Sequence, residues 1–61
     1  MNYKKKRKQW LLSQAEIAKL LLMSMRQYQR HEQGHVKGVE AVKRFERDFE
    51  RLIINLENGK V

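Results

Sequence analysis

Two helix-start signals stand eleven residues apart in this 61-residue chain. Ser13-Gln14-Ala15-Glu16 matches the capping box, in which a serine caps a helix and the glutamate three residues later reaches back. Ser24-Met25-Arg26-Gln27 repeats the pattern with a glutamine as its last member. Apolar residues occupy the positions of a hydrophobic staple around each box: Leu12 with Ile17, and Met23 with Tyr28. The sequence therefore predicts two short helices that meet at a corner.

Composition points to one small helical domain. The chain has no cysteine and no proline, so neither a disulfide framework nor a thiolate zinc site is available, and helix-forming residues dominate. The longest apolar run is the four residues 20–23, and the charged N-terminus is not followed by an apolar segment. We expect a single all-α domain over residues 1–61, without a transmembrane span or signal peptide, in the cytoplasm.

The first predicted helix covers about residues 14–21, with Ile17, Leu20 and Leu21 on its inner face and Ala18 at a close helix contact. The second covers about residues 25–33 and stops at Gly34, which suits a left-handed C′ position. Its inner face holds Tyr28, His31 and Glu32. Its outer face consists of Met25, Arg26, Gln29, Arg30 and Gln33. Arginine and glutamine are the side chains that match the edges of guanine and adenine.

The net charge of +7 is unevenly distributed. Residues 1–38 carry nine Lys or Arg against two Glu, whereas residues 39–61 carry five charges of each sign. A basic half beside a neutral half is typical of a protein with one surface for a polyanion. The run "KKKRK" at residues 4–8 is by itself equally consistent with a solvated tail.

The stretch "SQAEIAKLLLMSMRQYQRHEQG", residues 13–34, resembles the helix-turn-helix of the Cro and lambda-repressor-like family. The family's Ser or Thr and Gln at the start of the first helix match Ser13 and Gln14, and its Ala at the crossing matches Ala18. The start of its recognition helix matches Ser24, and its closing Glu-x-Gly matches Glu32 and Gly34. The resemblance covers roughly residues 3–38. It also implies an ion pair between Arg7 and Glu32.

We expect three short helices followed by one long C-terminal helix, either continuous or broken in two, in which the C-terminal part departs from the family plan. The resemblance implies a DNA-binding domain with these roles. Arg26, Gln29 and Arg30 would read bases, with Gln27 and Met25 in supporting contact. Ser24 and Gln14 would hold phosphates at helix starts, and His35 and Lys37 would add phosphate contacts from the loop after the recognition helix. We expect a small phage-type or mobile-element repressor that binds double-stranded DNA as a homodimer on a palindromic operator.

Two residues depart from the family pattern. Leu22 stands where the family usually has glycine, so this residue either adopts a left-handed conformation at a cost of about 1 kcal/mol or widens the turn. Tyr28 replaces the usual Val or Ile, and its hydroxyl needs a partner or water.

The resemblance also recasts residues 3–12 as a helix rather than a tail. Asn2 would cap it, and its lysines would lie on the side opposite the core or along a phosphate strand. Its inner face would comprise Tyr3, Arg7, Trp10 and Leu11, with Trp10 as a core anchor.

A long helix is predicted over residues 39–58, with Asn58-Gly59 as its stop. Its apolar residues Val42, Phe45, Phe49, Leu52 and Leu56 are spaced 3, 4, 3, 4, and Ile53 widens the stripe. One interpretation is that this stripe packs on the preceding helices. The other is that its far half pairs with a second subunit, with a dimer interface made of Phe45, Phe49, Leu52, Ile53 and Leu56.

Other functions have weaker support in the sequence. His31 and His35 are four residues apart, but Gly34 lies between them and no third ligand is evident, so we expect no metal or other cofactor. No nucleophile with a base stands out, so we expect no enzyme. The alternative function is a protein-interaction module (an antitoxin, an antirepressor or an inhibitor of a nucleic-acid enzyme), and a third is a DNA-bending protein for recombination.

Overall fold

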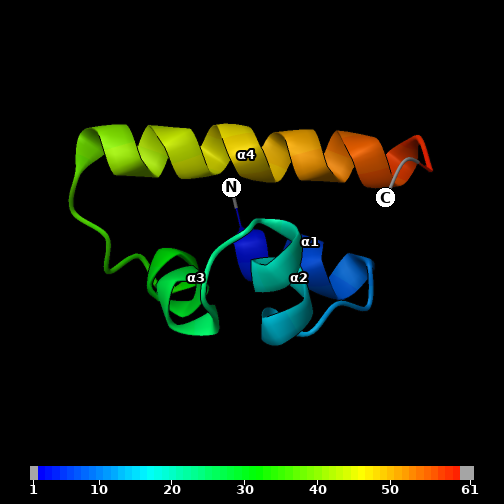
Figure 1. Cartoon of the computed structure of the whole chain (residues 1–61), viewed down its shortest axis with the longest axis horizontal. Coiled ribbons are helices and arrows are strands. Elements are labelled where there is room, and N and C mark those ends of the chain that lie inside the picture. The colour runs from blue at the N-terminus through cyan, green and yellow to red at the C-terminus, as the bar shows by residue number, and fades with distance from the viewer. Residues whose placement is uncertain (1, 60–61) are drawn as a thin grey trace.

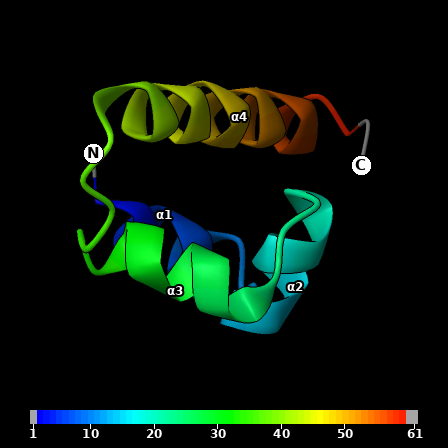
Figure 2. The same cartoon turned by 60° about the vertical axis from the view of Figure 1, so that its left-hand side comes forward.

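The structure is a computed structural model that describes residues 2–59. It has four helices: α1 (Tyr3–Gln9), α2 (Gln14–Leu20), α3 (Met25–Glu32) and α4 (Val39–Glu57), and no strand within the described residues. The long helix α4 lies along one side of the three short helices, as both views show (Figures 1 and 2). The predicted all-α fold is confirmed, and no described helix has both the length and the apolar character needed to cross a membrane.

The capping boxes form as predicted. The Ser13 hydroxyl accepts from the Glu16 backbone N–H at 3.1 Å, and the Glu16 carboxylate accepts from the Ser13 N–H at 2.9 Å. Ser24 and Gln27 make the same reciprocal pair at 3.1 Å each. Asn2 caps α1 by accepting from the Lys5 backbone N–H. These contacts set where the first three helices begin, and the corner between α2 and α3 is confirmed.

Each of the three short helices ends in the same type of turn, the Schellman motif. In this turn two backbone N–H groups donate to carbonyls of the last helical turn. After α3, Gly34 is left-handed (φ 75°), and the N–H groups of Gly34 and His35 donate to His31 and Arg30. After α2, Leu22 takes the same position with φ 58°. Its N–H donates to Lys19, and the Met23 N–H donates to Ala18. Leu22 therefore adopts the left-handed conformation, and the turn is as tight as a glycine would make it.

The end of α1 corrects the sequence prediction. The helix stops at Gln9 because Leu11 is left-handed (φ 56°) and the Leu12 N–H turns back to the Arg7 carbonyl. Trp10 is the C-cap and is exposed rather than a core anchor, and Leu11 is 90% exposed. Leu20, expected on the inner face of α2, is also exposed.

The core lies between α4 and the short helices. Its fully buried large side chains are Ile17, Tyr28 and Phe49, one from each of three helices. The Phe45 ring contacts the Tyr3 ring edge-on at 4.8 Å and stacks flat on the His31 imidazole, with ring centroids 4.1 Å apart. Tyr3 of α1 and His31 of α3 thus both pack on one residue of α4. The remaining core residues are Ala18, Leu52 and Ile53, with Leu12, Leu21, Met23 and Leu56 packed against them.

The expected dimer interface is corrected by this packing. Phe45, Phe49, Leu52 and Ile53 are buried in the core of the single chain, and Leu56 packs partly against it. The physical reason is the length of the molecule. Its longest extent is 32 Å, so a 19-residue helix, about 28 Å long at 1.5 Å per residue, covers the short helices along nearly all of its length. The apolar stripe of α4 therefore packs internally, as the first of the two interpretations stated.

Candidate nucleic-acid interface

Helix α3 has two chemically different sides. Its inner side carries buried Tyr28 and half-buried His31 and Glu32. Its outer side carries Met25, which is 47% exposed, exposed Arg26 and Arg30, exposed Gln33 just past the helix end, and half-buried Gln29. The structure thus brings the predicted outer-face residues together on one surface, and it places Gln29 deepest among them.

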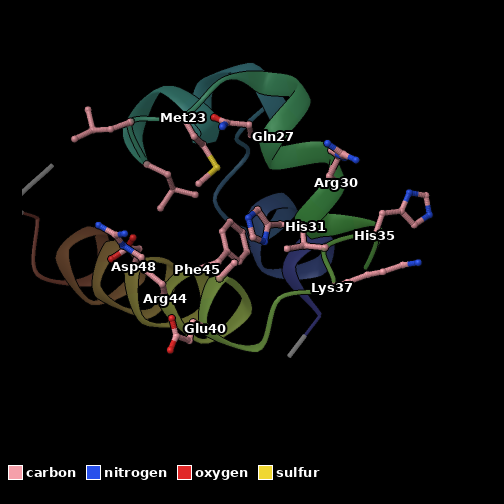
Figure 3. A pocket seen from close by; sticks show the side chains of 14 residues that line it. Met23, Gln27, Arg30, His31, His35, Lys37, Glu40, Arg44, Phe45 and Asp48 are labelled. Carbon is pink, nitrogen blue, oxygen red and sulfur yellow. The ribbon is translucent and has the colours of Figure 1, made fainter.

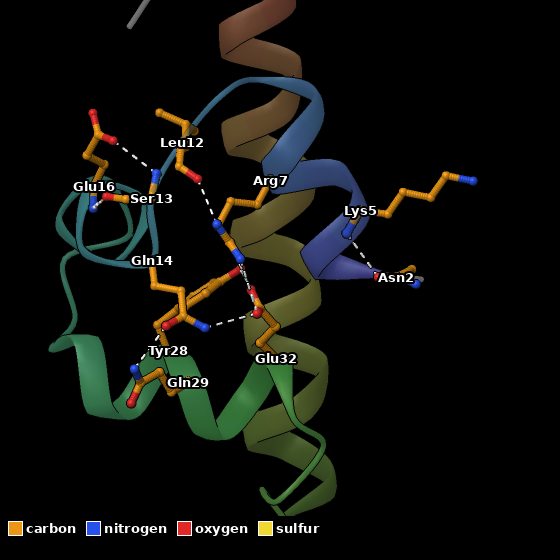
Figure 4. A network of polar contacts seen from close by, with 10 residues as sticks. All are labelled: Asn2, Lys5, Arg7, Leu12, Ser13, Gln14, Glu16, Tyr28, Gln29 and Glu32. Atoms are coloured by element: carbon orange, nitrogen blue, oxygen red, sulfur yellow. Dashed lines mark hydrogen bonds and ion pairs between the residues drawn. The ribbon is translucent and has the colours of Figure 1, made fainter.

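A polar network beneath α3 ties it to α1 and α2 (Figure 4). The Arg7 guanidinium donates from Nε to Glu32 Oε2 at 3.0 Å, from Nη2 to Glu32 Oε1 at 3.4 Å, and from Nη1 to the Leu12 carbonyl at 2.8 Å. The Tyr28 hydroxyl donates to the same carboxylate. The two charged side chains are only 10% and 5% exposed. The implied Arg7–Glu32 pair is present, and the Tyr28 hydroxyl has its partner.

The network keeps Glu32 ionised. Burial opposes ionisation, but hydrogen bonds from Arg7, Tyr28 and Gln14 outweigh it and hold the pKa of Glu32 below its usual value. The same pairing raises the pKa of Arg7, and burial together with the hydrogen bond to Glu32 raises the pKa of Tyr28. At neutral pH the carboxylate is therefore an acceptor for every group around it.

Gln14 and Gln29 extend the network to the outer side of α3. Gln14 donates from Nε2 to Glu32 Oε1 at 3.0 Å, and its Oε1 accepts from Gln29 Nε2 at 2.9 Å. Both ends of the Gln14 amide are thus engaged within the protein, which leaves one of its N–H groups for the expected phosphate contact. No sequence pattern predicts the Gln14–Gln29 bond, because the bond depends on how α2 and α3 cross.

At the start of α3, the capping bonds between Ser24 and Gln27 use some of the polar groups of these two side chains. The Ser24 hydroxyl accepts from the Gln27 N–H, so its own O–H remains available as a donor. The Gln27 side-chain oxygen accepts from the Ser24 N–H, so its amide N–H groups are what it can present outward. Ser24 and Gln27 can therefore both donate to an anion or a base.

An open groove of about 1140 Å³ runs between α3, α4 and the loop that joins them. His31, Phe45 and Met23 form its floor, and Arg30, His35 and Lys37 point outward at one end (Figure 3). His35 and Lys37 are both exposed. The two predicted loop residues thus lie beside Arg30 at the C-terminal end of α3.

In the part of the chain that the structure describes, no carboxylate pairs with the exposed cations of this surface. Within residues 2–59, the only ion pair closer than 4 Å is Arg7–Glu32. Arg26, Arg30 and Lys37 therefore present uncompensated positive charge. In the same part of the chain, no group of three or more His, Cys, Asp or Glu side chains is arranged to hold a metal ion.

Comparison with protein-family models, curated proteins and solved structures finds no match for this chain. The outer side of α3 combines guanidinium groups, amides and one thioether on an exposed helix. This combination suits an anionic partner that also offers hydrogen-bonding edges and apolar contacts.

Proposed function

We propose that the chain is a sequence-specific double-stranded DNA-binding protein that inserts α3 into the major groove. The observation that supports this most is the contrast between the two sides of α3. Its inner side is held by a satisfied polar network, whereas Arg26 and Arg30 on its outer side have no ion-pair partner among residues 2–59. A major groove about 12 Å wide admits a helix, and an arginine can donate two hydrogen bonds to guanine.

Four residues of the outer side, and Gln27 beside them, have distinct roles in this proposal. Arg26 and Arg30 donate to guanine O6 and N7, and Gln29 reads adenine. Met25, nearly half exposed at the first turn, contacts the methyl group of thymine. Gln27 supports these contacts with its amide N–H groups.

Phosphate contacts come from both ends of α3. In this proposal the Ser24 hydroxyl and the backbone N–H groups of the first turn donate to one phosphate, and the remaining Gln14 N–H donates to another. Lys37 and His35, in the loop that follows, contact the backbone beyond the other end of the helix. These contacts hold the register of α3 without reading sequence.

The Arg7–Glu32 network keeps α3 in place before DNA arrives. A helix fixed by buried hydrogen bonds to α1 and α2 loses little conformational entropy on binding. The base-reading residues are thereby preorganised, which favours affinity for one sequence.

We further propose that the protein is a small transcriptional repressor of phage or mobile-element type, working as a homodimer in the cytoplasm. Two copies of α3 spaced one helical turn apart, about 34 Å, would read a palindromic operator. Because the apolar stripe of α4 is buried, the dimer would use other exposed apolar residues, among them Ile54 near the end of α4. Repression then follows from occupying a promoter against polymerase.

The test is selection of bound sequences from a random duplex pool with the full chain. We expect enrichment of a palindromic motif, and loss of that enrichment in an Arg26→Ala, Arg30→Ala double variant. A variant with both Lys43→Ala and Arg47→Ala on α4 is a control matched in charge, and it should keep the motif. No enriched sequence in any round would contradict the proposal.

One observation favours a second candidate, a protein-interaction module. Leu11 and Leu22 are 90% and 93% exposed, and Leu22 lines the groove that Arg30 and Lys37 also line. An exposed leucine in a groove lined by cations suits an acidic partner with apolar anchors. This candidate predicts no enrichment in the duplex selection and, unlike DNA binding, a strong dependence of binding on Leu22.

A further inference from the structure

The hydrogen bonds from Glu32 through Gln14 to Gln29 all run in one direction. Ionised Glu32 has no proton to donate, so Gln14 must turn its Nε2 toward the carboxylate. That choice turns Gln14 Oε1 toward Gln29, and an oxygen can only accept. Gln29 must therefore turn its own Nε2 inward, as observed at 2.9 Å.

The carboxylate thereby determines which end of the Gln29 amide faces outward. A free glutamine side chain can exchange its oxygen and nitrogen by rotation of the amide at little cost. In this chain the rotation would place two oxygens, those of Gln14 and Gln29, against each other. Figure 4 shows the Gln29 oxygen turned away from Gln14.

The part of the Gln29 amide that faces outward determines which bases it can bind. Gln29 presents its oxygen and one remaining N–H on the outer side of α3. Adenine offers the complementary pair in the major groove, the N6 donor and the N7 acceptor, and cytosine offers only the N4 donor. Guanine and thymine place acceptors, O6 and O4, where the Gln29 oxygen would meet them.

We infer that Gln14 is a positioning residue that fixes the Gln29 amide, so that Gln29 selects adenine, and after it cytosine, over guanine and thymine. The inference rests on the proposed DNA-binding function and adds to it the base class read at one position. Arg7 and Tyr28 contribute by filling the other sites of the carboxylate, which leaves Glu32 Oε1 to Gln14 and one guanidinium N–H.

The experiment measures affinity of the full chain for the selected operator with each of the four bases at the position read by Gln29. That position is the one whose preference disappears in Gln29→Ala. The parent should bind the duplex with adenine at this position about fivefold or more tightly than the duplex with guanine. In Gln14→Leu the amide is free to rotate, so the ratio should fall to about one. Preferences at the other positions should stay, and circular dichroism checks that the variant folds.

A second variant reverses the direction of the bonds. In Gln14→Lys the ammonium donates both to Glu32 and to Gln29, so Gln29 must accept with its oxygen and turn its N–H groups outward. The preference at that one position should then shift from adenine toward guanine. Because Gln14→Lys retains a donor to Glu32, the network beneath α3 is kept. Gln9→Leu, which removes an exposed glutamine of α1 outside both the network and the outer side of α3, should leave the preference unchanged.

Each other result overturns the inference. An adenine preference that survives unchanged in both Gln14 variants shows that Gln14 does not orient Gln29, while specific binding, and with it the proposed function, stands. If Gln29→Ala changes the base preference at no position of the operator, Gln29 reads no base. If the parent binds all duplexes alike, the proposed function fails and the inference fails with it.

Discussion

His31 is the one histidine built into the packing between α3 and α4. Its imidazole lies flat on Phe45, and burial lowers its pKa from the ordinary value of 6.5. In the unfolded chain the same imidazole is in water and takes up its proton at the higher pH. Between the two pKa values only the unfolded chain is protonated, so stability must fall as the pH drops below about 6.5.

We predict that His31→Phe removes this loss while keeping a stack on Phe45. The measurement is the free energy of unfolding by urea between pH 7.5 and pH 5. The parent should lose stability across that range, and His31→Phe should lose clearly less. His35→Gln, at an exposed position, is the matched control and should follow the parent. Parallel curves for parent and His31→Phe would refute the role given to His31.

Glu32 sets a second acid-sensitive step at lower pH. Its pKa is depressed in the folded chain, so the stability it contributes is present above the unfolded value of 4.5 and is lost as the pH falls through the folded value. Protonation also removes the acceptor toward which Arg7, Tyr28 and Gln14 donate. The network beneath α3 and the stability of the chain are thus linked to one carboxyl group.

Individual residue roles were predictable where chemistry is local. The caps at Ser13 and Ser24 follow from spacing alone, since each bond joins residues three apart. The Arg7–Glu32 pair joins residues 25 apart, and only the family resemblance suggested it. The Gln14–Gln29 bond had no sequence signal, because nothing local distinguishes a glutamine that pairs from one that is solvated.

At the scale of elements, helix starts were predicted more accurately than helix ends. All four starts carry a capping residue or a glycine in the sequence, and the described helices begin there. The end after Gln9 was missed because Leu11, a residue that favours helices, occupies the left-handed turn position. The turn at Leu22 was predicted because the second capping box begins at Ser24, and the usual glycine of the family marks the same position.

These turns predict a stabilising substitution. A left-handed residue other than glycine costs roughly 1–2 kcal/mol, and Leu22 regains little of this by burial because it is 93% exposed. Leu22→Gly should therefore stabilise the chain by about 0.5–1 kcal/mol after the entropy of glycine is counted, raising the melting temperature by about 2–8 °C. Leu22→Ala keeps the strain and should give no such gain. A melting temperature that Leu22→Gly leaves equal or lowers would show that the turn is unstrained.

On the scale of the whole molecule, one long helix completes a core that the short helices cannot close alone. A domain of this size buries only about 60% of the surface of its unfolded chain. Every buried residue of α4 therefore matters for folding. The sequence predicted the apolar stripe of α4 correctly, but it could not tell an internal from an intermolecular partner, because the spacing of apolar residues is the same for both.

Two substitutions on α4 test whether its apolar stripe packs within the chain or against a second subunit. Leu52→Asp places a charge in the core of the single chain and should destabilise it by at least about 3 kcal/mol, enough to unfold a small domain. Ile54→Asp, at a position 55% exposed, should leave the circular dichroism spectrum unchanged. Sedimentation should then show whether Ile54→Asp turns a dimer into monomers, as the proposed dimer requires. If the Leu52→Asp variant were instead folded and monomeric while the parent is a dimer, Leu52 would belong to the dimer interface and not to the core.

The central claim, that the outer side of α3 reads bases, is tested by comparing two cations of this surface. In the proposed complex Arg26, on the exposed side of α3, reaches a base edge, whereas Lys37, in the loop after α3, only attracts phosphate. Arg26→Ala should cost about 1–3 kcal/mol on the selected duplex and relax the choice at one base pair. Lys37→Ala should weaken selected and scrambled duplexes alike and lower the slope of log affinity against log salt by about one. The measurement is a titration of both variants against both duplexes at several salt concentrations, and an equal loss of affinity for the two duplexes in Arg26→Ala would contradict base reading by α3.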